Sequence, residues 1–166
     1  MLSERINFLA VVTAVAGLAG FIGVYAKWFS YEYAVEGGVV TIFLDGTWDI
    51  TGALALTGGI GALAFGCAYI LLADPAIRRI TVILMLISSV VLFLSSAFGF
   101  TRVDDAVTAS PLMPGATGSE FTATVALGLW VSFVSGLLAS VASILLAGGR
   151  EPAQQEEEAT AAAGAA

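Results

Sequence analysis

Four long stretches of this sequence contain no charged residue, and they constrain the fold more than any other feature. They are Ile6–Ala26, Ile50–Ala73, Ile80–Thr101 and Phe121–Gly149. A helix needs about 20 mostly apolar residues to cross about 30 Å of hydrocarbon, and each stretch is long enough. Charged residues make up only 11% of the chain, whereas soluble domains contain about 25%. The sequence therefore predicts an all-α membrane protein, built as an antiparallel bundle of four transmembrane helices.

The ends of the membrane domain follow from the same pattern. The first stretch is longer than the apolar core of a signal peptide, so we interpret it as a retained helix. The last stretch has 29 residues, more than one crossing needs. We expect its span to cover 121–147, and to tilt or to project beyond the bilayer. Residues 1–149 then form the membrane domain. The acidic, alanine-rich tail 150–166 is expected to be disordered, with an acidic docking tail as the alternative.

Composition also argues against several classes of function. The net charge is −7, there is no histidine, and Cys67 is the only cysteine. A chain without a basic surface is not expected to bind nucleic acid. The lack of histidine removes the usual zinc sites and His-based catalysis. We therefore expect no catalytic residue, no metal site, no cofactor and no enzymatic activity, and we interpret Cys67 as a small apolar filler in the second span.

The orientation follows from the basic residues that flank the spans. One side of the membrane would carry four of them, Arg5, Arg78, Arg79 and Arg150, and the other side Lys27 and Arg102. The side richer in Lys and Arg usually faces the cytoplasm. We therefore predict a multi-pass protein of the cell membrane with both termini in the cytoplasm. The loops 27–49 and 102–120 then lie outside, and the short loop 74–79 lies inside.

Small residues at four-residue spacing indicate where helices approach one another. The glycines concerned are Gly20 and Gly23 in the first span, Gly58 and Gly66 in the second, and Gly128 and Gly136 in the fourth. Such spacing serves packing within a bundle, which we favour, and also homodimerisation or docking to a larger partner. The third span begins with bulky residues. We therefore expect spans one, two and four to pack closely, and much of span three to face lipid.

The first outer loop has the pattern of a short β-hairpin. Phe29, Tyr31, Tyr33 and Val35 alternate with smaller or polar residues, which is the period of a strand. Residues 36–38 can form a glycine-containing turn, and the β-branched and aromatic run 39–44 follows. An isolated hairpin is marginally stable in water, so this one must pack on the helices. Asp45 fits a turn, and Asp49 fits the N-cap of the second span.

Two tryptophans flank this hairpin. Trp28 and Trp48 are interpreted either as interfacial anchors among lipid headgroups, which we favour, or as part of a surface that binds a partner. The second interpretation would also involve the aromatic residues of the hairpin, so the candidate interaction residues are Trp28, Trp48, Tyr31, Tyr33 and Phe43.

This layout resembles the claudin-like superfamily of four-helix membrane proteins. The resemblance is carried by Trp28 just after the first span and by Gly46-Thr47-Trp48 before the second. The pair of loop cysteines typical of that family has no counterpart here. The resemblance implies inner termini, a β-rich first outer loop and a role in adhesion, scaffolding or channel modulation, without catalysis.

These observations predict a non-enzymatic integral membrane protein that acts by contact. It would be an accessory subunit or scaffold of a membrane assembly, with the lipid bilayer and either a membrane-protein partner or a second copy as its neighbours. The alternative is an oligomeric pore or a transporter of small solutes or lipids, suggested by the glycine-rich second and fourth spans.

Overall fold

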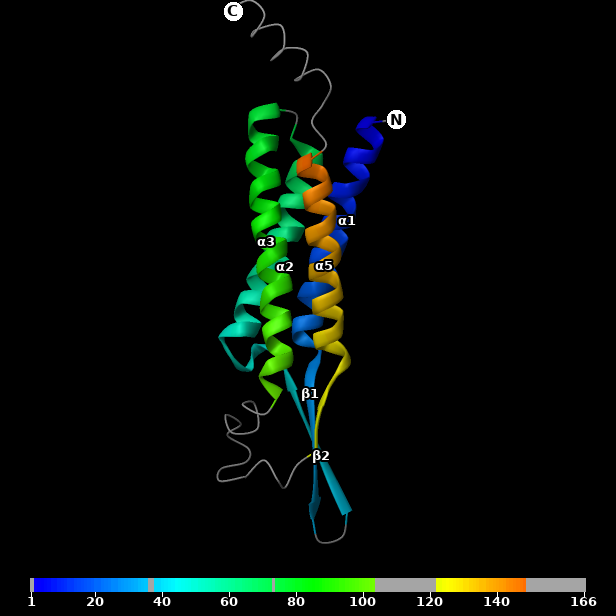
Figure 1. Ribbon diagram of the computed structural model, residues 1–166, viewed down its shortest axis with the longest axis vertical. Coiled ribbons are helices and arrows are strands. Elements are labelled where there is room, and N and C mark those ends of the chain that lie inside the picture. The colour runs from blue at the N-terminus through cyan, green and yellow to red at the C-terminus, as the bar shows by residue number, and fades with distance from the viewer. Residues whose placement is uncertain (1, 36–37, 73, 104–121, 149–166) are drawn as a thin grey trace, which may run out of the picture.

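Four long helices form the body of the described structure (Figure 1). The computed structural model describes residues 2–35, 38–72, 74–103 and 122–148. Within these ranges the helices are α1 (Leu2–Tyr25), α2 (Ile50–Leu71), α3 (Pro75–Thr101) and α5 (Leu127–Gly148). Each of the four is long and apolar enough to cross a membrane. Together they suggest a multi-pass membrane protein.

The helices form a ring in which each one packs against two neighbours. α1 and α3 both contact α2 and α5, whereas the diagonal pairs α1–α3 and α2–α5 hardly touch. The chain therefore runs up and down around the bundle. α1 begins and α5 ends at the end where α2 is joined to α3, which we call the turn end. The opposite end carries a small β-sheet and is called the sheet end (Figure 1).

Capping side chains fix where α2 and α3 begin. The Asp49 carboxylate accepts a hydrogen bond from the backbone N–H of Gly52 at 3.1 Å, so Asp49 is the N-cap of α2, as predicted. Asp74 accepts from the N–H of Ala76 at 2.8 Å, and Pro75 occupies the first turn of α3. Proline suits that position because its missing N–H would have no helical partner there.

The turn between α2 and α3 is shorter than the sequence suggested. The predicted inner loop 74–79 is largely helical, because α3 already begins at Pro75. The Arg78 side chain closes the turn: its Nε donates to the carbonyl of Leu72 at 2.5 Å, and its guanidinium carbon lies 5.3 Å from the centre of the Tyr69 ring. A positive group at the C-terminal end of α2 also complements the helix dipole.

A three-stranded antiparallel sheet covers the sheet end, in the order β2-β1-β3. β1 (Lys27–Val35) continues directly from α1 and pairs with β2 (Gly38–Asp45), which confirms the predicted hairpin. A short 3-10 helix, η1 (Gly46–Trp48), then leads into α2. Asp45 begins it by accepting from the N–H of Thr47 at 2.8 Å, which confirms its place in a turn.

The third strand was not predicted. β3 (Thr122–Val125) pairs with Phe29–Glu32 of β1 and leads into α5, which begins only at Leu127. The prediction that the fourth span starts at residue 121 is therefore wrong, because β3 comes first and the helix starts six residues later. The extra length beyond one crossing is β-structure at the sheet end, because a strand there can complete the ladder of β1.

The prediction that spans one, two and four pack closely is wrong for the second and fourth, because α2 and α5 hardly touch and α3 lies between them. α3 packs against α2 and α5 as closely as α1 does. Its bulky residues do lie exposed, among them Ile83, Ile87 and Phe98. Its opposite face is a buried stripe that alternates large and small side chains, namely Thr81, Met85, Ser89, Leu92, Ser95, Ser96 and Gly99.

Two apolar clusters form the described core. The larger one lies at the sheet end and contains Val24, Trp28, Phe29, Tyr31, Ala55, Leu92 and Leu129. The smaller one contains Ala10, Tyr69, Met85 and Leu146, towards the turn end. Buried hydroxyls also line the helix contacts, and most of them donate to the carbonyl four residues earlier, as Ser89 does to Met85 at 2.8 Å.

Candidate interaction surface

Trp28 joins the sheet to the helix bundle and is fully buried. Its indole Nε1 donates to the carbonyl of Gly23 at 3.0 Å. Two glycines give the ring its space. A Cβ at Gly46 would lie 2.5 Å from the indole, and a Cβ at Gly99 would lie 3.2 Å from it. Both interpretations of Trp28 are therefore wrong, because a side chain enclosed by its own protein reaches neither headgroups nor a partner.

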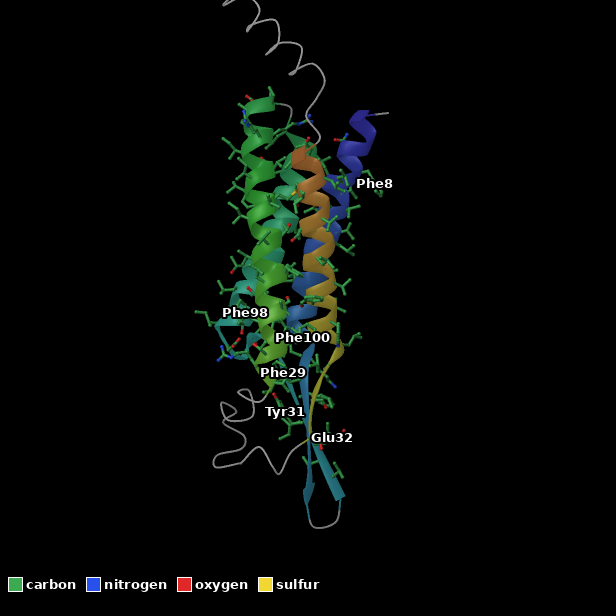
Figure 2. All side chains as sticks on the ribbon, in the orientation of Figure 1. Phe8, Phe29, Tyr31, Glu32, Phe98 and Phe100 are labelled. Atoms are coloured by element: carbon green, nitrogen blue, oxygen red, sulfur yellow. The ribbon has the colours of Figure 1, made fainter. Side chains whose placement is uncertain are left out.

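Tyr31 ties the sheet to the end of α3. Its ring is buried, and its hydroxyl donates to the carbonyl of Val103 at 2.9 Å. Phe29 is buried between Trp28 and Tyr31, with ring centres 6.4 Å and 6.3 Å away. Figure 2 shows Phe29 where the sheet meets the helices and Tyr31 further along the strand. Tyr31 is thus part of the core and not, as predicted, part of an interaction surface.

Of the predicted interaction residues, Phe43 alone has a side chain described as exposed. Its exposed fraction is 46%, and the ammonium group of Lys27 lies 3.4 Å from the centre of its ring. A cation placed over an aromatic face is attracted to it. The side chains of Tyr33 and Trp48 lie outside the described part of the structure.

The alternation of the strands gives the sheet two unlike faces. The packed face carries Phe29, Tyr31, Ile42, Leu44, Ala123 and Val125, all of which belong to or contact the larger core cluster. The open face carries Glu32, Thr41, Phe43, Thr122 and Thr124, all of which are exposed. Figure 2 shows Glu32 next to Tyr31 along β1. The packed face fixes the sheet on the bundle, and the open face is available for contact.

The hairpin continues beyond the reach of β3 and away from the helices (Figure 1). β3 pairs with β1 only as far as Glu32, so the rest of the hairpin is two-stranded within the described residues. Its apolar residues Val39 and Val40 are 65% and 36% exposed. We call the exposed apolar residues of β2, Val39, Val40 and Phe43, the hairpin tip. Val39 and Val40 lie at its free end, and Phe43 lies nearer the base, opposite Ser30. Exposed apolar groups on a projecting strand are suited to contact with another molecule.

An ion pair connects α2 and α3 at the sheet end. The guanidinium of Arg102 lies 3.6 Å from the carboxylate of Asp49, and the two side chains are 39% and 11% exposed. Asp49 lies at the N-terminus of α2 and Arg102 at the C-terminus of α3, so each charge also complements the dipole of its own helix. Asp104 and Asp105, which follow Arg102 closely in the sequence, lie outside the described ranges.

All six glycines predicted to mediate helix packing face other parts of the same chain. A Cβ at Gly58 would lie 2.6 Å from the backbone N of Leu92, and one at Gly136 would lie 2.7 Å from the backbone of Phe93. Gly20 faces the Leu92 side chain across the bundle. The other three follow the same rule: Gly23 faces Ser132, Gly66 faces Ala14, and Gly128 faces Ala26 and Lys27. This arrangement agrees with packing within one bundle.

The sequence reading missed β3 and the Asp49–Arg102 pair. A signal for β3 was present, because Thr122 and Thr124 alternate with Ala123 and Val125, which is the period of a strand. The ion pair joins residues more than fifty positions apart, and no local pattern points to it. Cys67, predicted to be a filler, is exposed on the outside of α2.

Within the described ranges, no group of three or more His, Cys, Asp or Glu residues is placed to hold a metal ion. The arrangement at the sheet end offers contact surfaces and hydrogen-bonding edges. Comparison of the chain with models of protein families and with curated proteins found no match.

Proposed function

We propose that this chain is a non-enzymatic integral membrane protein that acts by contact, as an accessory subunit or scaffold of a membrane assembly. The contact surface is the hairpin tip. The observation that carries the proposal is that Val39, Val40 and Phe43 are exposed on a hairpin whose base is held by the buried Trp28 and Tyr31. A rigid support lowers the entropy that binding costs, and apolar and aromatic side chains dominate the energy of most interfaces.

Charge supports an orientation for this surface. Arg78 and Arg79 begin α3 at the turn end, and the positive-inside rule favours the cytoplasm for that end. We therefore assign the turn end and both termini to the cytoplasm, and the hairpin tip to the outside of the cell membrane. The exposed apolar residues of the four helices then face the lipid bilayer.

The resemblance to the claudin-like superfamily adds adhesion, or modulation of a neighbouring membrane protein, to the roles that fit this proposal. Trp28 and Gly46-Thr47-Trp48 carry that resemblance. In this chain Trp28 is buried, so its role in the proposal is to hold the base of the hairpin and not to contact a partner.

Purification from native membranes tests the proposal. The chain would be tagged, extracted in mild detergent and analysed by native mass spectrometry, alongside a tip variant carrying Val39→Thr and Phe43→Ser. The matched control carries Thr122→Ser and Thr124→Ser on the open face of β3. We expect the wild type and the control to be recovered in assemblies larger than the 17.0 kDa chain, and the tip variant to lose them. A wild type that is always a solitary monomer would contradict the proposal.

The alternative of an oligomeric pore or transporter has weaker support. It was suggested by the glycines of the second and fourth spans, and those glycines face intrachain neighbours. The two helices are also diagonal to one another in the bundle and hardly touch.

A further inference from the structure

The second strand of the hairpin is an edge. β2 pairs with β1 on one side, and β3 lies beyond β1, so the described sheet ends at β2. Its residues are exposed at Gly38–Thr41, Phe43 and Asp45 and half-buried at Ile42 and Leu44. An edge strand presents backbone N–H and C=O groups that another strand can pair with.

This edge lacks the features that usually prevent such pairing. Natural edge strands are commonly protected by lysine, proline, a bulge or an inward-pointing charge. Residues 39–44 contain no charged residue and no proline. The irregularity in the β1–β2 register lies between Lys27 and Phe29, next to the helices and away from the tip. The edge is therefore suited to the addition of a strand.

We propose that the occupant of this edge is the β2 strand of a second copy. The two strands pair antiparallel, and the two-fold axis passes midway between the two Thr41 residues. Opposed residues of an antiparallel pair lie on the same face of the sheet. This register therefore places Thr41 opposite its own copy, Val39 opposite Phe43 and Val40 opposite Ile42. Thr–Thr and aromatic–β-branched pairs are among the stabilising cross-strand pairs, so β2 is complementary to itself.

Asp45 is the only charged residue of β2, and it favours the register with the axis at Thr41 over the register with the axis at Ile42. With the axis at Thr41, the described strand of the second copy ends at Gly38, opposite Leu44, so Asp45 meets no charge of that strand. With the axis at Ile42, Asp45 would lie opposite Val39, which places a carboxylate against an apolar side chain. Parallel pairing about an axis along the strand would exchange the two faces, and would put the half-buried Ile42 beside exposed open-face residues.

This pairing has a consequence for the two bundles. The hairpin extends away from the helices along the long axis of the molecule (Figure 1). An axis perpendicular to the sheet therefore sends the two bundles in opposite directions, so the two copies lie in facing membranes. The inference rests on the proposed function, because it uses the outward assignment of the sheet end.

Cross-linking of purified protein in detergent tests the register. In a Cys67→Ala background, Thr41→Cys is expected to form a covalent dimer under mild oxidation. The matched control is Thr122→Cys on the opposite edge of the same sheet. A mixture of differently tagged Val39→Cys and Phe43→Cys chains is expected to give the mixed dimer. The inference is overturned if Thr41→Cys forms no more dimer than the control, or if Val39→Cys joins mainly to its own kind.

Clustering of proteoliposomes tests the facing arrangement. Vesicles that carry the wild type, with the sheet end outward, are expected to cluster. Thr41→Lys places two ammonium groups opposite one another on the axis and should slow clustering about tenfold, since directly opposed like charges destabilise a pair of strands. Thr122→Lys should leave it unchanged. If wild-type vesicles stay dispersed while tip-dependent assemblies are still recovered from native membranes, this inference fails and the proposed function stands.

Discussion

At the scale of single residues, Trp28 determines how the sheet and the bundle meet. Tryptophan next to a membrane span is usually an interfacial anchor, and the sequence offered no reason to expect otherwise. In the structure the indole fills the end of the bundle, because Gly46 and Gly99 leave room for it and Gly23 supplies the acceptor for its N–H. The position of the Trp28 ring thus depends on glycines that are distant in the sequence.

Replacing Trp28 tests this role. Trp28→Ala should lower the free energy of unfolding by about 3–5 kcal/mol, because it leaves a cavity in the core. Trp28→Phe should lower it by about 1–2 kcal/mol through the lost hydrogen bond and volume. Denaturant titration in mixed micelles measures both. The control Trp130→Phe changes a tryptophan that is 51% exposed and should have little effect. Equal losses at the two sites would contradict the assignment.

Asp49 has two separate roles that substitutions can resolve. Asp49→Asn keeps an acceptor for the N–H of Gly52 but removes the ion pair with Arg102, so it should cost less than about 1 kcal/mol of unfolding free energy. Asp49→Ala removes the cap as well and should cost about 1–2 kcal/mol. The same titration compares them, with Asp74→Ala as a second cap removal. If Asn is as damaging as Ala, the ion pair outweighs the cap.

At the scale of elements, α3 packs closely with its neighbours, although the bulky residues in its sequence did not suggest this. Gly58 of α2 and Gly136 of α5 both come close to its backbone near Leu92, and Gly20 of α1 faces the Leu92 side chain. Helices in lipid gain little from hydrophobic burial and associate through close packing and hydrogen bonds. Glycines at these positions allow α2 and α5 to approach one turn of α3, and they leave room for the Leu92 side chain against α1.

Substituting Gly58 measures the value of that approach. The added Cβ of Gly58→Ala would lie 2.6 Å from a backbone nitrogen of α3, which no side-chain rotation relieves. We expect a loss of about 1–3 kcal/mol in unfolding free energy, despite the better helix propensity of alanine. Gly148→Ala is the matched control, since its Cβ would meet nothing within 4 Å. A neutral Gly58→Ala would mean that α2 and α3 are farther apart.

At the scale of the whole molecule, the order of helices around the ring decides which surfaces are free. α3 lies between α2 and α5, so its buried stripe is fully used within the bundle and its bulky face points outward. The sheet lies at one end, and within the described residues its hairpin projects from the helices (Figure 1). The proposed contact through the hairpin would use this projection.

An engineered disulfide tests the order of the helices. The hydroxyl oxygens of Ser89 on α3 and Ser143 on α5 are 3.4 Å apart. In a Cys67→Ala background, Ser89→Cys with Ser143→Cys should form a bond within one chain, detected as a shift in gel mobility. Cysteines at Ile60 and Leu138, exposed on the diagonal helices α2 and α5, should not. The reverse result would contradict the ring.

The sequence alone determined the elements whose signals are local. Uncharged apolar stretches define four helices. Asp45 marks a turn and Asp49 a helix start. Alternation in residues 29–35 and the β-branched and aromatic run 39–44 define the hairpin, because each pattern depends on neighbours along the chain. Tertiary structure decided what depends on distant partners. It buried Trp28 and Tyr31, added β3 to the sheet, paired Asp49 with Arg102 and placed α3 between α2 and α5 in the ring. Burial and pairing are properties of the space between elements, and that space exists only once all four helices are packed.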